Sequence, residues 1–434
     1  MRLRYLAIAA GVVVIALAGV AQIGRDNGEP VTATPATGAP AMFTTLAARG
    51  EYLARAADCL GCHVTGGGKP YAGGRSFDLP FGRIYSTNIT PDPETGIGRF
   101  TEQQFVDAVQ HGKAPRGNLY PAMPYAAYAS MSREDVLAIR AYLETVEPVK
   151  TTVPANELPF PFNQRWGLAV WKRIFASTAP ARYDGQKTLL WNRGAYLAGA
   201  LGHCAECHTP RNVGFGLKSS ESLSGETLLG QRAYNITPDA AHGIDSWTNT
   251  QLEKYLSTGH ADGHGSATGP MAEVINYSLR HLTPGDISAL VAYLREGQAK
   301  TGANPITVSI EPSLARSSGA VYAADAGLAH ARGLQVFANQ CAGCHQFDGT
   351  GRGSPFATLL GAKTVNDTAG TNLVKVILEG SSLQTAHGAE RMPGFGMSLD
   401  DGDIAAVSNY VLAQMGDKSG VVSAQDVARA RTGQ

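Results

Sequence analysis

The sequence has no surplus charge of either sign, and it has no cysteine outside three short motifs. Lys plus Arg and Asp plus Glu both number 36 in 434 residues, so the formal net charge is zero. A nucleic-acid surface needs a basic excess, which argues against that class of protein. The chain also lacks a nucleophile motif, a G-x-G-x-x-G turn after a predicted strand, and repeats of propeller length. With 51 glycines and 23 prolines, it is expected to be rich in loops.

All six cysteines lie in C-x-x-C-H motifs, so none remains for a separate disulfide. The motifs read CLGCH, CAECH and CAGCH, at Cys59–His63, Cys204–His208 and Cys341–His345. A thioredoxin-like dithiol would need one such motif beside a βαβ pattern, and a zinc site would need four ligands. A histidine directly after every pair is instead typical of covalently attached c-type haem. Three copies in a repeated context predict three haem c groups.

The motif is part of a longer repeat, so the chain contains three diverged copies of one unit. Each copy begins with Arg-Gly and a short apolar helix, in RGEYLARAADCLGCH, RGAYLAGALGHCAECH and RGLQVFANQCAGCH. Each copy ends with an amphipathic helix whose apolar residues recur at i, i+3 and i+7. These residues are Val136, Ile139 and Leu143; Ile287, Leu290 and Leu294; and Ile404, Val407 and Val411.

Start signals and small residues support the helix predictions. Ser132 can cap the last helix of the first copy, and Thr283-Pro284 places Pro just inside that of the second. A glycine after each Arg would let another helix approach the first one closely, and an aromatic ring on the last helix would fill the thin core. The residues are Gly50, Gly194 and Gly333, with Tyr142, Tyr293 and Tyr410 on the last helices.

The N-terminal residues resemble a targeting or membrane segment. Arg2 and Arg4 precede an uncharged run from Tyr5 to Gly24, whose length lies between that of a signal peptide and a membrane span. The Pro/Ala/Thr-rich stretch that follows is a tether, which favours a retained anchor with the two arginines in the cytoplasm. We therefore expect the body of the protein at the inner membrane, on the periplasmic side, where c-type haem is attached.

The chain is expected to divide into eight segments. These are a signal or anchor segment (1–24), a tether (25–43), unit one (44–148), a linker (149–190), unit two (191–297), a second linker (298–330), unit three (331–416) and a C-terminal tail (417–434). The first linker contains the apolar stretch LAVWKRIF. It is predicted to be a helix packed between units one and two, and the alternative is a contact with a partner subunit or the membrane surface.

The motif chemistry assigns the covalent and the proximal contacts of each haem. Two cysteines three residues apart lie on one side of a helical turn, so both thiols can reach the vinyl groups of one porphyrin. The histidine after the second cysteine points its imidazole at the iron. The predicted attachment residues are Cys59, Cys62, Cys204, Cys207, Cys341 and Cys344, and the predicted proximal ligands are His63, His208 and His345.

The sixth iron ligand is predicted to be methionine, a soft thioether that raises the haem potential. Each unit has a Met next to a proline before its final helix: Met123, Met271 and Met392. A lone Met is usually core filler, but the same placement in three units favours ligation. Met131 is expected to be packing, whereas Met397 is a rival to Met392.

Other histidines and two loops complete the candidate set. A second His could replace Met at a low-potential haem, but His260 and His264, the one close pair outside the motifs, are predicted to be loop residues. YSTNITP (85–91) and YNITP (234–238) recur at similar distances after the first two motifs. We expect these loops to line the cofactor, because haem propionates need hydrogen-bond donors.

The sequence resembles the tri-haem cytochrome c subunit of membrane-bound bacterial dehydrogenases that oxidise alcohols, gluconate or other sugars, and aldehydes. The matching stretches are GEYLARAADCLGCH, YAGGRSFDLPFGRIYSTNITPDPETGIG, LYPAMPY, WNRGAYLAGALGHCAECHTPRN, TGPMAEV and MPGFG. The resemblance implies a mainly α fold of three tandem class I-type cytochrome c domains, each a few short helices wrapped around a covalent haem with long loops. It also implies the axial pairs His63–Met123, His208–Met271 and His345–Met392.

The resemblance further implies a role without substrate chemistry of its own. A catalytic partner subunit would carry a quinone, a flavin, or a molybdenum centre with iron–sulfur, and the three haems would pass its electrons to membrane ubiquinone. GHADGHGSATGPMAEV is more similar to cytochromes beside molybdenum hydroxylases. The apparent anchor departs from relatives with a cleaved signal.

Three other functions stay open from the residues alone. A haem peroxidase would need one haem with an open sixth site. A cytochrome subunit of a terminal oxidase would pass electrons in the other direction. A zinc-binding scaffold would be colourless.

Overall fold

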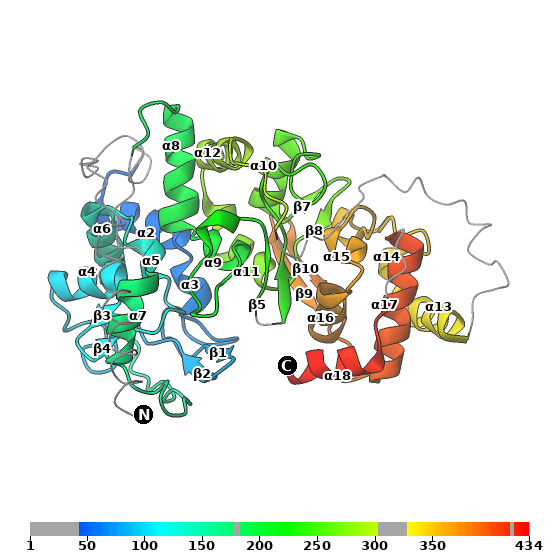
Figure 1. The fold of residues 1–434 in the computed structure, drawn as a ribbon, viewed down its shortest axis with the longest axis horizontal. Coiled ribbons are helices and arrows are strands. Elements are labelled where there is room, and N and C mark those ends of the chain that lie inside the picture. Colours follow the sequence, from blue (N-terminus) through cyan, green and yellow to red (C-terminus); the bar gives the residue numbers. More distant parts are fainter. Residues whose placement is uncertain (1–42, 177–182, 229, 303–327, 417–420, 434) are drawn as a thin grey trace, which may run out of the picture.

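Short helices joined by long loops form most of the structure (Figure 1). This computed structural model describes residues 43–176, 183–228, 230–302, 328–416 and 421–433. Within those ranges the strands form only two-stranded antiparallel hairpins, and no larger sheet is present. The predicted mainly α fold is therefore confirmed.

The helices and strands follow the predicted repeat. Unit one contains α2 (Leu46–Ala56), α3 (Cys59–Cys62), α4 (Glu102–His111), α5 (Tyr125–Tyr128) and α6 (Arg133–Leu143), with hairpins β1–β2 (Ser76–Leu79, Gly82–Tyr85) and β3–β4 (Lys113–Ala114, Gly117–Asn118). Unit two contains α8 (Leu189–Tyr196), the π-helical η1 (Leu197–Leu201), α9 (Ala205–His208), η2 (Ser219–Glu221), α10 (Asn249–Thr258), α11 (Gly269–Tyr277), η3 (Leu279–His281) and α12 (Pro284–Arg295), with hairpins β5–β6 (Glu226–Leu228, Gln231–Ala233) and β7–β8 (His260–Ala261, Gly265–Ser266).

Unit three repeats the plan with fewer strands. It contains α13 (Leu328–Gln340), α14 (Ala342–His345), η4 (Pro355–Ala357), α15 (Lys363–Asn366), α16 (Thr371–Glu379) and α17 (Asp401–Met415), with the hairpin β9–β10 (Ser381–Thr385, Gly388–Met392). The segment predicted as a tail includes a further helix, α18 (Ala424–Thr432). Val427 of α18 is fully buried in the core of unit three, so this helix is part of the unit's packing.

In every unit the first and the last helix cross at the predicted glycine. A Cβ on Gly50, Gly194 or Gly333 would lie 1.8, 1.9 or 2.4 Å from the carbonyl oxygen of Ala138, Ala289 or Ala406, respectively. The same Cβ would lie within 3.0 Å of the Cβ of the predicted tyrosine in each unit. No side chain fits at this distance, so the glycine is required by close packing.

The last helices bury the predicted apolar stripe. All nine residues of the i, i+3, i+7 patterns in α6, α12 and α17 are at most 7% exposed. The predicted caps are also present: Ser132 accepts from the N–H of Asp135 at 3.1 Å, and Thr283 accepts from that of Asp286 at 3.2 Å. These caps satisfy backbone donors at the helix starts.

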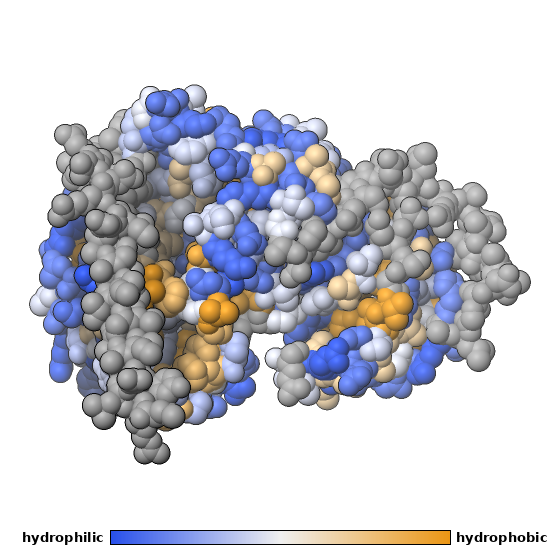
Figure 2. Space-filling view, viewed as in Figure 1, coloured by the Kyte–Doolittle hydropathy of each residue, from blue (hydrophilic) through white to orange (hydrophobic). Residues whose placement is uncertain are grey.

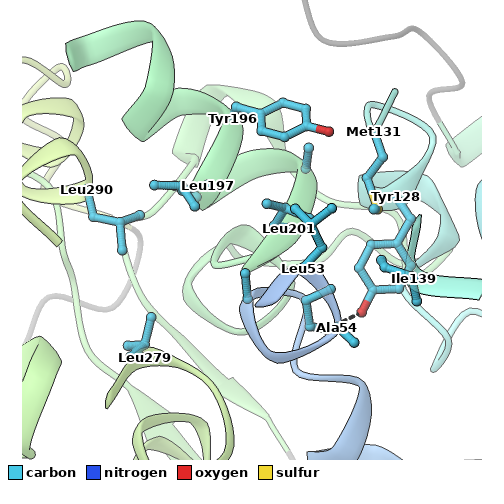
Figure 3. Close-up of a cluster of buried hydrophobic side chains, with 14 of the residues drawn as sticks. Leu53, Ala54, Tyr128, Met131, Ile139, Tyr196, Leu197, Leu201, Leu279 and Leu290 are labelled. Carbon is cyan, nitrogen blue, oxygen red and sulfur yellow. Dashed lines mark hydrogen bonds between the residues drawn. The ribbon is translucent and has the colours of Figure 1, made fainter. Parts of the chain in front are cut away.

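Units one and two share one continuous hydrophobic core (Figure 3). Leu53, Tyr128 and Met131 from unit one pack in the same cluster as Leu197 and Leu201 from unit two. Met131 is 2% exposed in this cluster, as expected for a packing residue. The two units therefore stabilise each other through burial of apolar surface.

Two tyrosines cross this boundary in opposite directions. Tyr52 of α2 donates to Asp286 of unit two at 2.5 Å, and Tyr196 of α8 donates to Asp135 of unit one at 2.6 Å. Each hydroxyl also accepts a backbone N–H from the start of the opposite helix, at 3.2 and 3.1 Å. The arrangement is reciprocal, as in a two-fold interface. Unit three has Gln335 at the equivalent position, and Gln335 is exposed.

Helix α7 (Gly167–Phe175) lies where the sequence predicts it, against both of the first two units. Lys172 donates to the carbonyl oxygens of His111 and Gly112 at 2.9 and 3.2 Å, and Trp171 Nε1 donates to that of Gly214 at 2.6 Å. Its opposite face carries Trp166, Val170 and Ile174 at i, i+4 and i+8, which are 72%, 56% and 58% exposed. The helix thus packs on one side only. Figure 2 shows one face of the whole molecule. This face is largely hydrophilic, with apolar patches over units one and three.

The predicted anchor and tether fall outside the described residues, except for Phe43. No helix in the described part of the chain is long and apolar enough to cross a membrane.

Candidate haem sites

Each C-x-x-C-H motif forms one helical turn directly after the first helix of its unit. The backbone N–H of the motif histidine donates to the carbonyl oxygen of the first cysteine at 3.1, 3.0 and 3.0 Å, in units one to three. Both cysteines of a motif therefore lie on one turn, as the spacing predicts. No disulfide joins any of the six cysteines, so every motif keeps both thiols for attachment.

The first thiol of each motif lies in apolar surroundings that keep it protonated. Burial raises the pKa of Cys59 to about 12, and that of Cys204 and of Cys341 to about 11. Within the described ranges, no group of three or more His, Cys, Asp or Glu side chains is placed to hold a metal ion directly. A porphyrin fits better, because it carries its own four nitrogen ligands to the iron.

The motif histidines are oriented by backbone carbonyls. Nδ1 lies 2.7 Å from Thr87 O for His63, 2.6 Å from Tyr234 O for His208, and 2.6 Å from Ala357 O for His345. A carbonyl can only accept, so Nδ1 carries the proton and Nε2 presents its lone pair. Burial lowers the pKa of all three rings, so they stay neutral, as iron ligation requires.

The two repeated loops supply the first two of these carbonyls. Thr87 belongs to YSTNITP and Tyr234 to YNITP. The following asparagine ties each loop to the chain after the last helix: Asn88 Nδ2 donates to Val149 O at 2.7 Å, and Asn235 Nδ2 donates to Lys300 O at 2.5 Å. The loops thus have a second role that the sequence did not suggest, which is to fix the end of each unit. The carbonyl in unit three was missed because PFATLL shares no pattern with the other two loops.

The predicted Met in each unit follows a repeated helix–glycine–hairpin element. α4, α10 and α16 each end at a glycine with positive φ, namely Gly112 (57°), Gly259 (82°) and Gly380 (80°), a conformation that favours glycine. Hairpins β3–β4, β7–β8 and β9–β10 follow directly. Met123 and Met271 come shortly after their hairpins, and Met392 ends β10.

The placement of the methionines agrees with the repeat. Met123 and Met271 are partly buried against the same cluster as Cys59 and Cys204, and Met392 is partly buried against the same cluster as Cys341. Met397, the rival in unit three, is fully exposed at 101%. A Met ligand must lie inside the haem crevice, so this position favours Met392.

The first two motifs lie next to each other. Arg75 of unit one donates to Gly61 O inside the first motif at 2.7 Å and to Glu273 of unit two at 2.6 Å. Burial, followed by Asp58, raises the pKa of Cys62 to about 12, and Cys207 of the second motif adds to this rise. The sites of units one and two therefore adjoin, which suits electron exchange between them.

Comparison with known families identifies the fold of all three units. The cytochrome c profile matches residues 47–147, 192–298 and 330–414, once around each motif. The chain belongs to the cytochrome c family. With three such domains and three C-x-x-C-H motifs, it is a tri-haem cytochrome c whose covalent haem c groups carry electrons.

Three relatives match nearly the whole of this cytochrome c. The fructose dehydrogenase cytochrome subunit of Gluconobacter japonicus is 39% identical over 99% of this chain and 90% of its own. The gluconate 2-dehydrogenase cytochrome c subunit of Pantoea cypripedii is 38% identical over 89% of each chain. The cytochrome c subunit of the quinone-type alcohol dehydrogenase of Gluconobacter oxydans is 35% identical over 89% of this chain and 82% of its own. These relatives confirm the resemblance noted from the sequence.

Sequence reasoning missed several residues around the sites. His264 lies in the turn between β7 and β8, as predicted for a loop residue, whereas His260 lies in β7, and the burial of both, at 6% and 2% exposure, was not foreseen. Asp58, directly before the first motif, is 8% exposed, and its pKa is raised to about 8 by burial and by Glu273. The sequence around Asp58 gives no signal of this kind, because Glu273, which helps to raise its pKa, belongs to unit two.

Proposed function

We propose that this cytochrome c is the electron-transfer subunit of a dehydrogenase complex on the periplasmic side of the inner membrane. It takes electrons from a catalytic subunit with a quinone, flavin or molybdenum/iron–sulfur centre that oxidises an alcohol, an aldehyde or a sugar acid, and delivers them to ubiquinone. The observation that carries this proposal is the likeness, over nearly the full chain, to cytochrome subunits of three dehydrogenases. The chain itself performs no substrate chemistry.

The haem sites are proposed to be six-coordinate, with the axial pairs His63–Met123, His208–Met271 and His345–Met392. Haem iron supplies one-electron cycling between Fe(II) and Fe(III). The protein holds each imidazole in the tautomer that exposes Nε2, through the carbonyl bonds of 2.6–2.7 Å described above. Attachment through Cys59 and Cys62, and the equivalent pairs, keeps the cofactor in a small domain. A chain of such sites passes electrons singly between a two-electron donor and ubiquinone, which takes up two electrons and two protons.

Contact with the membrane surface is proposed to involve α7. Its exposed stripe of Trp166, Val170 and Ile174 combines aromatic and aliphatic residues, and residues 159–176 contain two exposed arginines, Arg165 and Arg173, and no acid. Apolar side chains with a basic flank suit the headgroup region of an anionic bilayer. The triple Ser variant at these positions is expected to lose binding to anionic lipid vesicles, whereas a Leu189→Ser/Leu190→Ser control, also exposed, keeps it. Equal binding by both variants would remove α7 from the proposal.

The test of the main proposal is redox activity of the complex as isolated. The chain is purified in detergent with whatever subunits accompany it, and fructose, gluconate or a primary alcohol is added while the haem spectrum is recorded. We expect one of these substrates to reduce the haems and a soluble ubiquinone analogue to reoxidise them. Co-purification with a copper/haem oxidase would instead establish the terminal-oxidase role. A high-spin ferric haem with rapid peroxide turnover would establish a peroxidase.

A further inference from the structure

Unit three inserts a lysine into unit two. Lys363, the first residue of α15, donates from Nζ to the carbonyl oxygens of Gly243 at 2.9 Å, His242 at 3.2 Å and Asn235 at 3.3 Å. Its ammonium also lies 5.9 Å from the ring centre of Tyr234, whose carbonyl orients His208. A cation from one unit thus lies against the loop that holds the proximal histidine of another.

The backbone around Lys363 is locked against unit two. A Cβ on Gly361 would lie 1.9 Å from Gly263 O, and one on Gly265 would lie 2.5 Å from Ala362 Cβ. Both glycines have positive φ, 74° and 72°. The chain before Lys363 therefore runs directly over the turn of the β7–β8 hairpin, where α15 and β8 are neighbours in Figure 1. Lys363 has little freedom to swing away, unlike a lysine on an open surface.

Two ring nitrogens of unit two, one of them on a histidine that the charge of Lys363 affects, are buried without a hydrogen-bond partner. Trp247 and His264 are each 6% exposed and stack with ring centres 3.7 Å apart and planes 11° apart. Within the described residues, neither Trp247 Nε1 nor His264 Nδ1 has a hydrogen-bond partner. Burial, followed by the charge of Lys363, lowers the pKa of His264 to about 4, so the imidazole is neutral and can donate from Nδ1. Buried donors normally have acceptors, so two unpartnered ring nitrogens this close together call for one.

The lysine also lacks a carboxylate of its own. No Asp or Glu of the described chain forms an ion pair with it. The charge of Asp239 raises the pKa of Lys363, but Asp239 does not bind it. Its oxygens instead accept from the backbone N–H groups of Ala241 and His242 and from the Thr301 hydroxyl. Burial lowers the pKa of Lys363 to about 8, which shows how poorly carbonyls alone replace water around the charge. The two unpartnered ring donors and this cation together are complementary to a carboxylate, which accepts hydrogen bonds and carries a negative charge.

We propose that Trp247 Nε1 and His264 Nδ1 donate to a propionate carboxylate of the unit-two haem and that Lys363 provides its counter-charge, so that unit three supplies the positive charge for the haem of unit two. Apart from its iron, haem is polar only at its two propionates, and this group of donors lies beside the loop that orients His208. The proposal rests on the haem sites proposed above. Unit one has no equivalent of Trp247. The stretch GIDSWT (243–248) of unit two aligns with GIGRFT (96–101) of unit one, which places Phe100 at the position of Trp247.

The proposal makes Lys363 a positioning residue that adjusts one haem potential. A cation beside the carboxylate disfavours Fe(III), whose site carries one more positive charge than Fe(II). Removing the cation leaves a bare carboxylate, which favours Fe(III) and lowers the potential of that haem. A lysine that only joins the two units would change stability and leave all three potentials in place.

The test is a spectroelectrochemical titration of the full chain carrying Lys363→Gln, Lys363→Arg or Lys375→Gln. Lys375 is the control, since it is also in unit three, is 12% exposed and donates to Ala430 O at 3.1 Å, and its charge is already paired with Glu379 at 2.8 Å. We expect Lys363→Gln to lower one of three midpoint potentials, Lys363→Arg to restore it, and Lys375→Gln to change none. The affected component should be the one that Met271→Leu also alters.

A second variant keeps the proposal testable if Lys363→Gln does not fold. Trp247→Phe places in unit two the ring that unit one has, and it should lower the same midpoint potential by a smaller amount. The proposal would be overturned if Lys363→Gln had the same three midpoint potentials as Lys375→Gln. It would also be overturned if Trp247→Phe had the same potentials as the native chain. The haem content of the native chain distinguishes failure of this proposal from failure of the proposed function. Fewer than three haems per native chain would contradict the proposed function, whereas unchanged potentials in a chain with three haems would contradict only the role of Lys363.

Discussion

The reciprocal tyrosines should make units one and two unfold together. Replacing Tyr52 or Tyr196 by Phe removes a buried hydrogen bond to a carboxylate and leaves a backbone N–H at the opposite helix start without its acceptor. A hydrogen bond to a charged group contributes about 1.5–3 kcal/mol. Because the two bonds have no partner in common, the double variant should lose about 3–6 kcal/mol, a large share of the stability of a domain.

Hydrogen exchange measured by mass spectrometry tests this prediction with an internal control. Each single variant should reduce protection in both pairs of helices, α2 with α6 and α8 with α12, because the interface links them. Protection of α13 and α17 should not change, since unit three has exposed Gln335 at the equivalent position. Loss of protection confined to the unit that carries the substitution, or shared by unit three, would refute the reasoning.

Two further predictions concern packing and pH. Gly194→Ala should lower the free energy of unfolding, measured by urea titration, by about 1–3 kcal/mol, because the new Cβ must move from 1.9 Å to at least 3.0 Å from Ala289 O. Gly199→Ala is the control: a Cβ there has no atom within 4 Å, so this variant should be neutral or stabilised by up to about 1 kcal/mol. Because burial raises the pKa of Asp58 to about 8, the folded chain keeps a proton that the unfolded carboxyl releases near pH 4, so stability should fall as pH rises between about 4 and 8. Asp58→Asn should flatten this slope in urea titrations at several pH values, and an unchanged slope would show that Asp58 is not its source.

Local patterns were sufficient to predict the repeat. The spacing of Val136, Ile139 and Leu143, and the equivalent residues, identified the last helices because a 3.6-residue period survives in any context. The glycine after each Arg was informative for the same reason, since close helix contact is possible only without a Cβ. The C-x-x-C-H spacing fixed the motif turn, and the methionine repeat agrees with the partly buried position of Met392 and the exposure of Met397.

Contacts between units could not be predicted in this way. Tyr52 and Asp286 are 234 residues apart, and nothing in either local sequence indicates that they meet. Lys363 looks like a surface lysine until the glycines at 361 and 265 bring the two backbones together. His264 was predicted to be a loop residue because it lies between glycines, but unit three covers that loop. Such positions depend on tertiary packing rather than on propensity.

The most direct test of the account is the visible spectrum and haem content of the native chain and of five Met→Leu variants. The native chain should contain three low-spin haems. Leu at Met123, Met271 or Met392 should each convert one haem to a high-spin or alternatively ligated form, whereas Leu at Met131 or Met397 should leave all three unchanged. A colourless protein with bound zinc, or a native chain with one high-spin haem, would contradict the central claim of three His/Met electron-transfer sites.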